Sequence, residues 1–434
     1  MHEQFGGRVL HTSQRFGGWQ VVELPRTVAP AAVMQKYQQS GLIAQVELDA
    51  PIQAAMTLPD DPFFQSGAQW HLNNYGQDGG IPDADVDAPE AWDVVREAPD
   101  LIVAVLDSGV RWTHEDLRAN VWRNPRDGSP GLNPIAGTHD PWDDNGHGTH
   151  VAGLIGAVAN NRKGVSGVVW RVRLMAIKVL DGSGNGLFSD ALIGLDFALT
   201  NGARVLNISW TSTTNSLAFS NMLWQAGQVG VVVVCAAGNT GANLDLFPVW
   251  PAALRLPCQL TVAASTRTDD RYLTSAFGPQ TVDLYAPGVS LYSTASAHDS
   301  AYASLSGTSM AAAVVSGAVA LTIQRFPEAN PQEIVRRLRD AVDVRPAFQG
   351  RCRSGGRLNL RRIVDLPRLE IVAGNPPLLQ CMGQPGHTYV LWVSSDLYHW
   401  SSWTQVVLSS NNLTWMDPDF ATFPSRFYRA TPAP

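Results

Sequence analysis

The strongest constraint on the fold is a near-continuous apolar run in the middle of the chain, from Val231 to Val234. A strand buried on both faces has this pattern, because neither face meets water, and such strands belong to parallel sheets covered by helices. Similar short runs alternate with longer stretches of helical periodicity. They predict strands at 101–106, 173–180, 203–209, 229–236 and 258–264, and helices at 148–159, 188–200, 216–227, 309–325 and 331–341. We therefore expect an α/β fold with a doubly wound parallel sheet.

The chain is too long for one such domain. Its 434 residues exceed the length at which a single hydrophobic core usually stops growing, which is about 250–300 residues. We expect a small N-terminal α+β domain over 1–56, a linker and first segment of the main domain over 57–90, the α/β domain over 91–364, and an all-β, sandwich-like domain over 365–434.

The N-terminal segment has the pattern strand, helix, strand. A helical stretch over 29–39 lies between alternating stretches over 19–24 and 43–48, which suit a half-buried sheet. From Thr57 to Pro89 the chain is rich in Pro, Asp, Gly and Asn. This composition predicts an exposed linker, the part of the chain that a protease would cut most easily.

The C-terminal segment differs from the α/β domain in composition. After Val364 there are few charges and no long helical pattern, and short alternating stretches such as 388–393 and 413–415 predict a small β-sandwich. Its tryptophans could stack on sugars or line a partner site, although such residues more often belong to the core. They are Trp392, Trp400, Trp403 and Trp415.

Composition argues against several functions. With 38 acidic and 31 basic residues and no basic stripe, nucleic acid is not an expected partner. The four cysteines lack the Cys-x-x-Cys spacing of a zinc site, and their pairing is open. No apolar stretch reaches the ~18 residues of a membrane span, and the first residues show no signal peptide.

Three short runs carry chemistry. They are LIVAVLDSGV with Asp107, NGHGTHVAG with His147, and SGTSMAAA with Ser309. A serine hydroxyl is a weak nucleophile until a histidine removes its proton and a carboxylate orients that histidine. Taken singly, Ser309 could be a helix N-cap and His147 a core histidine. A zinc site at His147 and His150 is disfavoured, because helical zinc ligands usually stand four residues apart.

The order of these residues along the chain is aspartate, histidine, serine, which is the order of the subtilisins. The chain resembles the subtilisin-like serine peptidase family over roughly residues 59 to 364. Five motifs carry the resemblance: Asp107-Ser108-Gly109, Gly146 to Gly153, Ala236-Ala237-Gly238-Asn239, Asp283 to Gly288, and Ser306 to Ala311.

The resemblance implies a serine endopeptidase in which Ser309 is the nucleophile, His147 the general base and Asp107 the residue that orients His147. Asn239 follows a buried strand and two small residues, where its amide could donate to the oxyanion of a tetrahedral intermediate. The implied walls of the substrate side-chain pocket are Ser209, Trp210 and Thr211 on one side and Ala236, Ala237 and Gly238 on the other.

The chain departs from the family pattern after the nucleophile. Ala313 and Val314 stand where the family usually has proline and histidine, and we expect a shifted fit in the first helical turn with an intact nucleophile. Asp116 and Asn161 match positions that hold a structural calcium ion in many relatives, and oxygen ligands at turns suit calcium. Both could equally be turn formers.

The resemblance also implies a zymogen. Residues 1–56 would be a propeptide that inhibits its own enzyme before it is removed, and the enzyme would be secreted or held at the cell surface, act on proteins or peptides, and be monomeric. Three alternatives stay open. The N-terminal unit could be an ordinary subdomain, the protein could be an inactive scaffold that binds peptides, or it could be adhesive through its C-terminal domain.

Overall fold

The computed structural model describes residues 2–13, 18–25, 28, 30–47, 57–365, 367–372, 378–383, 387–409, 412–420 and 425–432. The chain forms two compact units, Met1–Ala55 and Met56–Pro434.

The N-terminal unit is built from two strands and a helix. β1 (Arg8–Thr12) pairs antiparallel with β2 (Gln20–Glu23), and α1 (Pro30–Gln39) follows. The second strand and the helix confirm the prediction for this segment. The strand predicted at 43–48 is wrong over 43–47, and Leu48 lies outside the described residues. Apolar alternation there had suggested a strand, but β2 finds its partner in β1 instead.

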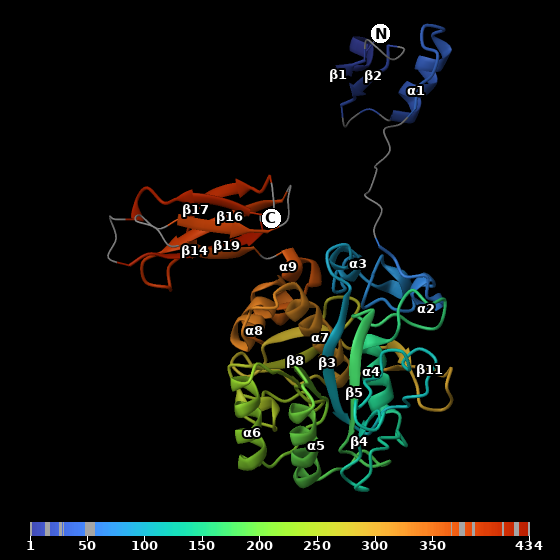
Figure 1. Ribbon diagram of the computed structural model, residues 1–434. Coiled ribbons are helices and arrows are strands. Elements are labelled where there is room, and N and C mark those ends of the chain that lie inside the picture. The colour runs from blue at the N-terminus through green and yellow to red at the C-terminus, as the bar shows by residue number, and fades with distance from the viewer. Residues whose placement is uncertain are drawn as a thin grey trace. The chain divides into compact units, whose positions relative to one another are not determined.

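The second compact unit contains an α/β part, called the α/β unit below, which is organised around one nine-stranded sheet (Figure 1). This sheet confirms the predicted fold class. The strand order is β12-β13-β9-β8-β7-β6-β3-β5-β4, and every neighbouring pair is parallel except β12 with β13. The strands are β3 (Glu97–Asp107), β4 (Gly131–Leu132), β5 (Arg171–Lys178), β6 (Val205–Ile208), β7 (Val232–Ala236), β8 (Gln259–Ser265), β9 (Leu284–Pro287), β12 (Val342–Val344) and β13 (Gly356–Leu358).

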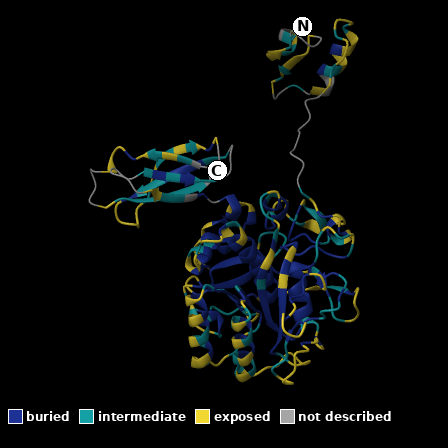
Figure 2. Ribbon diagram, in the orientation of Figure 1, coloured by how far each residue is buried: buried dark blue, intermediate teal, exposed yellow. Residues whose placement is uncertain are grey.

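The apolar strands are buried because helices cover both faces of the sheet. Successive side chains of β3 enter two different cores: Val103 and Val105 pack on one face, Ala104 and Leu106 on the other. α4 (His147–Gly156) and α7 (Thr308–Arg325) cover the first face, and α5 (Phe188–Thr200) and α6 (Leu217–Gln228) the second. Figure 2 shows the central strands as the buried part of this unit.

The sheet also positions the site. β5 and β6 lie on opposite sides of β3 although they follow it in sequence, so the strand order reverses at β3. In open α/β sheets, ligands bind where the order reverses, beyond the carboxyl ends of the strands. Asp107 is the last residue of β3.

The remaining elements complete this unit. Asn330 caps the start of α8, since its side chain accepts a hydrogen bond from the backbone N–H of Glu333. β10 (Leu291–Thr294) and β11 (Tyr302–Leu305) form a separate hairpin ahead of α7. The other helices are α2 (Pro62–Gln65), α3 (Ala88–Trp92), α8 (Pro331–Asp340) and α9 (Leu360–Asp365).

The stretch from Thr57 to Pro89 is not the exposed linker that its composition predicted. Asp61 and Leu72 are fully buried, and Gln69 exchanges two hydrogen bonds with the backbone of Ser166. The Pro, Asp and Gly residues do form turns, but these turns are fastened to the α/β core.

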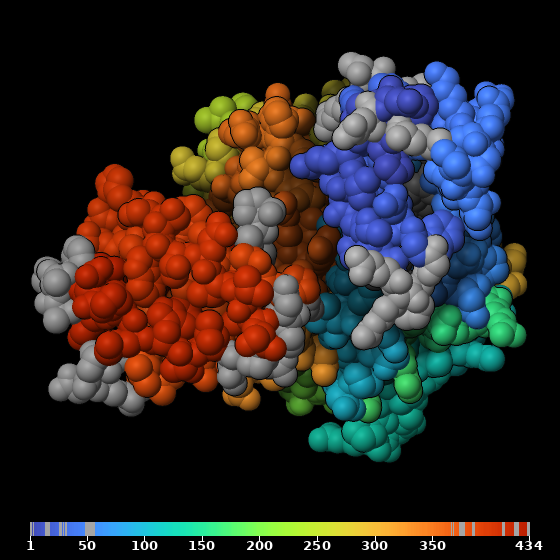
Figure 3. Space-filling model, turned by 90° about the horizontal axis from the view of Figure 1, so that it is seen from above, coloured from blue at the N-terminus to red at the C-terminus, as the bar shows by residue number. Residues whose placement is uncertain are grey.

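The C-terminal strands form two three-stranded antiparallel sheets, with orders β14-β15-β18 and β17-β16-β19. Figure 3 shows them, in red, as a continuous body of packed atoms. Of the four tryptophans, Trp403 and Trp415 pack against the small core around Tyr389 and Leu391, which fits the core interpretation for these two. The strands are β14 (Arg368–Val372), β15 (Leu378–Met382), β16 (Thr388–Ser394), β17 (Ser401–Val407), β18 (Asn412–Met416) and β19 (Phe427–Pro432).

The four cysteines are unpaired and buried. Burial raises the pKa of Cys258 to about 11, so this thiol is protonated at neutral pH. Within the described residues, no helix combines the length and apolar character needed to cross a membrane.

Candidate active site

Asp107 and His147 make the central contact of the site. Asp107 is fully buried at the end of β3, and His147 is the first residue of α4. Nδ1 of His147 lies 2.7 Å from Oδ1 of Asp107, and the backbone N–H of Ser108 donates to the same oxygen at 2.8 Å. A carboxylate that accepts from Nδ1 leaves Nε2 of the neutral ring free to take a proton.

The glycine after His147 is required by this contact. A Cβ atom at Gly148 would lie 2.1 Å from the carbonyl oxygen of Gly109 and 3.1 Å from Cβ of Asp107. Any side chain here would push α4 away from β3. The close approach of α4 to the end of β3 therefore requires glycine at position 148.

Two carboxylates act on the protonation of His147. Burial of the imidazole lowers its pKa, whereas the charge and hydrogen bond of Asp107 and the charge of Asp143 raise it. The net result is a pKa above the usual value of 6.5. The surroundings thus favour the imidazolium that forms when a histidine takes a proton from a nucleophile.

Ser309 lies in the first turn of α7 and is only 7% exposed. Its Oγ donates to the carbonyl oxygen of Ser209 at 3.0 Å. Among the described residues there is no hydrogen bond between Ser309 and His147. Such bonds are often absent or long in catalytic sites without substrate.

Asn239 is held in one orientation by the residue before Ser309. Its Oδ1 accepts from the backbone N–H of Thr308 at 2.9 Å and from the Thr308 hydroxyl at 3.2 Å. With the oxygen anchored, the amide nitrogen is left to donate elsewhere. Gly307, with a φ of +150°, allows this approach, since a Cβ there would lie 3.2 Å from that nitrogen.

The predicted pocket walls are brought together only in part. A Cβ at Gly238 would lie 3.7 Å from Cγ2 of Thr211 and 3.7 Å from Cγ2 of Val249, a neighbour that the sequence did not indicate. Trp210 is placed differently from the prediction. Its indole N–H donates to the carbonyl of Leu106 at 3.1 Å, and its ring packs against Phe219. The half-buried Trp210 side chain therefore packs against the core on the second face of the sheet.

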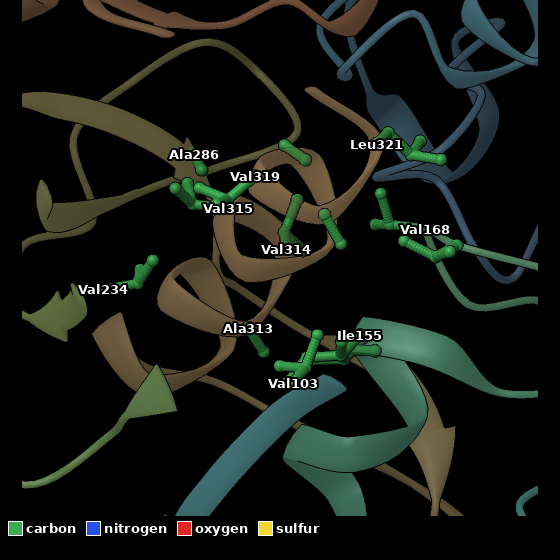
Figure 4. Packing of buried hydrophobic residues seen from close by; sticks show 14 of the residues in the cluster. Val103, Ile155, Val168, Val234, Ala286, Ala313, Val314, Val315, Val319 and Leu321 are labelled. Carbon is green, nitrogen blue, oxygen red and sulfur yellow. The ribbon is translucent and has the colours of Figure 1, made fainter. Parts of the chain in front are cut away.

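Helix α7 is continuous through the two positions that depart from the family pattern. Ala313 and Val314 are fully buried in the core between α7 and the sheet. Figure 4 shows them on α7 with Val103 of β3 and Ile155 of α4 among the surrounding side chains. An apolar core accepts these residues without any polar group to satisfy.

A buried polar network beside Ser309 was not predicted from the sequence. The Ser316 hydroxyl donates to Oδ1 of Asn207 at 2.8 Å, the Asn207 amide donates to the Ser209 hydroxyl at 2.9 Å, and that hydroxyl donates to the carbonyl of Ser309 at 3.2 Å. Asn207 interrupts an apolar strand and Ser316 an apolar helix. A polar residue inside an apolar run was the available signal, because buried polar groups are hydrogen-bonded.

The predicted calcium ligands lie together, but as a hydrogen-bonded pair. The amide nitrogen of Asn161 donates to Oδ1 of Asp116 at 2.7 Å, and Oδ2 accepts from the Val165 N–H and the Tyr302 hydroxyl. Within the part of the chain that the structure describes, no group of three or more His, Cys, Asp or Glu is placed to hold a metal ion. The calcium prediction is therefore not confirmed.

The chemistry of these side chains nevertheless suits a hard cation. Asp61 and Asp116 are both fully buried. Burial raises the pKa of Asp116 to about 6 against three hydrogen bonds that lower it, and the charge of Asp61 raises it further. Carboxylate oxygens are ligands that Ca²⁺ prefers, and the charge of a bound ion would offset the repulsion between these two buried carboxylates.

Comparisons with known proteins agree with this geometry. A model of the subtilase family matches residues 99–355. Thermitase of Thermoactinomyces vulgaris is 34% identical over 263 residues, 61% of this chain and 84% of thermitase. A thermophilic serine proteinase of a Bacillus species is 33% identical over 290 residues, 67% of this chain and 65% of that protein.

Solved structures give the same result. Proteases from Pseudoalteromonas arctica match with a TM-score of 0.60 and 30% identity, covering 71% of this chain and 99% of theirs. A cold-adapted subtilisin-like serine proteinase matches with a TM-score of 0.56 and 29% identity, over 67% of this chain and 97% of that one. With its fold, its family model and its relatives in agreement, this chain belongs to the subtilase family and is a serine endopeptidase.

Proposed function

We propose that the enzyme cleaves peptide bonds with Ser309 as nucleophile, His147 as general base and Asp107 as the residue that orients His147. The Ser309 hydroxyl leaves the carbonyl of Ser209, gives its proton to Nε2 of His147 and attacks the peptide carbonyl. His147 then returns the proton to the leaving amine. The 2.7 Å contact between Asp107 and His147 is the observation that carries this proposal.

The oxyanion of the intermediate would be stabilised by two donors. One is the amide nitrogen of Asn239, whose oxygen is anchored by Thr308. The other is the backbone N–H of Ser309 at the start of α7, where the helix dipole also favours negative charge.

The direct test is labelling by a fluorophosphonate, which reacts with activated serines. The wild type should be labelled and Ser309→Ala should not. Equal labelling of both proteins would contradict the assignment of Ser309.

We propose that the side chain before the cleaved bond lies between Ser209–Thr211 and Ala236–Gly238. Because the Thr211 and Val249 methyl groups are within van der Waals reach of a Cβ at Gly238, this space suits a small side chain.

Thr211→Gly should therefore favour larger side chains. We expect the ratio of kcat/KM for a Phe substrate to that for the matched Ala substrate to rise by about tenfold, the usual scale for small changes in pocket volume. Thr214→Gly, at an exposed position of the same segment, is the control. The same Phe/Ala ratio in both variants would argue against this pocket.

We propose that Ca²⁺ binds at Asp61 and Asp116, with Asn161 offering its amide oxygen in place of its nitrogen. The ion would neutralise the buried carboxylates and stabilise the native state.

Chelation should then lower the melting temperature by roughly 5 °C, because a ligand at a hundredfold excess over its Kd contributes about 2–3 kcal/mol. Calcium should restore it and magnesium should not. Asp116→Asn is the matched variant and should not respond to chelation. If the wild type melts at the same temperature with and without chelator, calcium does not stabilise the native state. The hydrogen bond from Asn161 to Asp116 then holds these side chains without an ion.

We further propose that residues 1–56 are a propeptide that the enzyme removes by itself. The division of the chain into compact units at Ala55 and Met56 supports this proposal.

A further inference from the structure

Asp143 is a second buried carboxylate beside the catalytic residues, and the sequence did not single it out. It is 2% exposed and accepts hydrogen bonds from both ends of the turn that carries His147. Oδ1 accepts from the backbone N–H groups of Asn145 at 3.1 Å and Gly146 at 2.8 Å. Oδ2 accepts from the backbone N–H of Thr149 at 2.9 Å and from its hydroxyl.

The same carboxylate reaches the residue that follows Asp107. The Ser108 hydroxyl donates to Oδ1 of Asp143 at 2.9 Å and accepts from the backbone N–H of Gly148 at 2.9 Å. A hydroxyl can donate one hydrogen bond and accept others, so the Ser108 hydroxyl can make both of these bonds at once. Ser108 thus joins the end of β3 to the start of α4 by a second route, besides the contact between Asp107 and His147.

Ser108 is also held from its backbone. Nζ of Lys178, a buried residue next to Asp107 in the sheet, donates to the carbonyl of Ser108 at 2.7 Å and to Asp144 at 2.6 Å. The hydroxyl and the carbonyl of Ser108 are therefore both occupied. A residue tied at both groups has little freedom to shift Asp107.

Two carboxylates act on His147 through their charge, one from β3 and one from the turn before α4. Asp107 on β3 and Asp143 in the preceding turn are negative, and both raise the pKa of His147 against the effect of burial. His150 lies on the same helix as His147 and is buried. Burial and the charge of His147 are among the causes that lower the pKa of His150 to about 4, so it is neutral near pH 7.

We propose that Asp143 is a positioning residue of the catalytic reaction, which holds His147 against Asp107 through Ser108 and whose negative charge stabilises the imidazolium that forms during attack. The inference rests on the proposed role of His147 as general base. The proposal adds to the site a carboxylate that touches neither the substrate nor the reacting atoms. Asp143 acts through Ser108 and the turn that carries His147.

The first test is Asp143→Asn, which keeps the size of the side chain and removes its charge. We expect kcat/KM to fall by about 10- to 100-fold, since several hydrogen bonds to a charged group are lost near the base. The charge of Asp143 raises the pKa of His147, so its removal lowers that pKa. The acid limb of the pH profile of kcat/KM, where the base becomes protonated, should therefore move to lower pH by about half a unit or more.

Asp140→Asn is the matched control, because Asp140 is exposed in the same loop and bonds to Trp112. Its kcat/KM and its acid limb should stay close to wild type. If folded Asp143→Asn has the profile of Asp140→Asn, the proposal is overturned. A loss of activity with an unmoved acid limb would also overturn it, because a purely structural role gives that result.

Ser108→Ala decides the matter if Asp143→Asn does not fold. The variant removes the hydroxyl bridge and leaves the charge of Asp143 in place. We expect kcat to fall by about tenfold with KM unchanged. An unchanged kcat in folded Ser108→Ala would overturn the proposal. His147→Ala serves as the reference for the whole series: an active His147→Ala enzyme would contradict the general base itself, not the role of Asp143.

Discussion

Replacement of Ser309 by alanine is expected to lower kcat for peptide hydrolysis by about 10⁶-fold, and His147→Ala should have a similar effect. This is the loss measured for the corresponding residues of a subtilisin, where the members of the triad act as a unit. The physical reason is that an unionised serine is a poor nucleophile and Nε2 of His147 is the group free to take its proton. The measurement is the initial rate with a chromogenic peptide, using each variant at high enzyme concentration.

Two comparisons make this result specific. The double variant of Ser309 and His147 should be no slower than either single variant, because one missing member already disables the unit. Asn239→Ala should lose less, about 10²- to 10³-fold in kcat, since only one oxyanion donor is removed. Ser66→Ala, at an exposed serine near α2, is the control and should match wild type. If Ser309→Ala retains wild-type kcat, Ser309 is not the nucleophile.

Most of the catalytic sheet could be predicted from the sequence, because its strands are buried on both faces. The run around Val233 has no polar side to accommodate, and it forms β7 between β6 and β8. Helix α5 was predicted over 188–200 and is observed over the same residues. In both cases local pattern and tertiary environment agree, which makes prediction from one sequence reliable.

The errors occur where the deciding partner is distant in sequence. Residues 43–47 alternate like a strand, but a strand needs a neighbour, and β1 already pairs with β2. The turn-rich stretch after Thr57 has the composition of a linker. It is held against the α/β core by hydrogen bonds with residues about a hundred positions away: Asp61 accepts from the backbone N–H of Asn160, and the Gln69 amide donates to the carbonyl of Ser166. The amino-acid composition of the stretch predicts its turns, but it cannot predict contacts with residues far away in the sequence.

The same distinction applies to the site. Asp107 and His147 could be predicted because each lies in a recognisable glycine-containing motif; they belong to different elements, β3 and α4, and the structure places them 2.7 Å apart. Asp143 and Asn207 lie outside these motifs, and each accepts a hydrogen bond from a residue distant in sequence, Asp143 from Ser108 and Asn207 from Ser316. The resemblance implied Trp210 as a pocket wall, yet alternate residues of an extended chain point to opposite sides. Its half-buried indole packs against the core on the second face of the sheet.

Self-processing is the second large effect we expect. On incubation the wild type should lose an N-terminal fragment, whereas Ser309→Ala should stay full length. The structure narrows the region of the cut: the backbone of Thr57 donates to Asp93 at 2.8 Å, and Asp61 and Trp70 are buried in the α/β unit. Cutting after these residues would require breaking the core, so the cut should lie before Thr57. The stretch in which we expect the cut includes residues 48–56, which lie outside the described residues.

The fragment should therefore contain about 50 residues, and at most the 56 that precede Thr57. Before release, its last residues would lie along the active site as a product-like strand, which pairs its backbone with the edges of the site. The released fragment, added back, should then inhibit the mature enzyme. Intact mass spectrometry of wild type and Ser309→Ala, incubated side by side, is the measurement. Identical cleavage in both would show that another protease makes the cut, and an intact wild type would show that the N-terminal unit is a permanent subdomain.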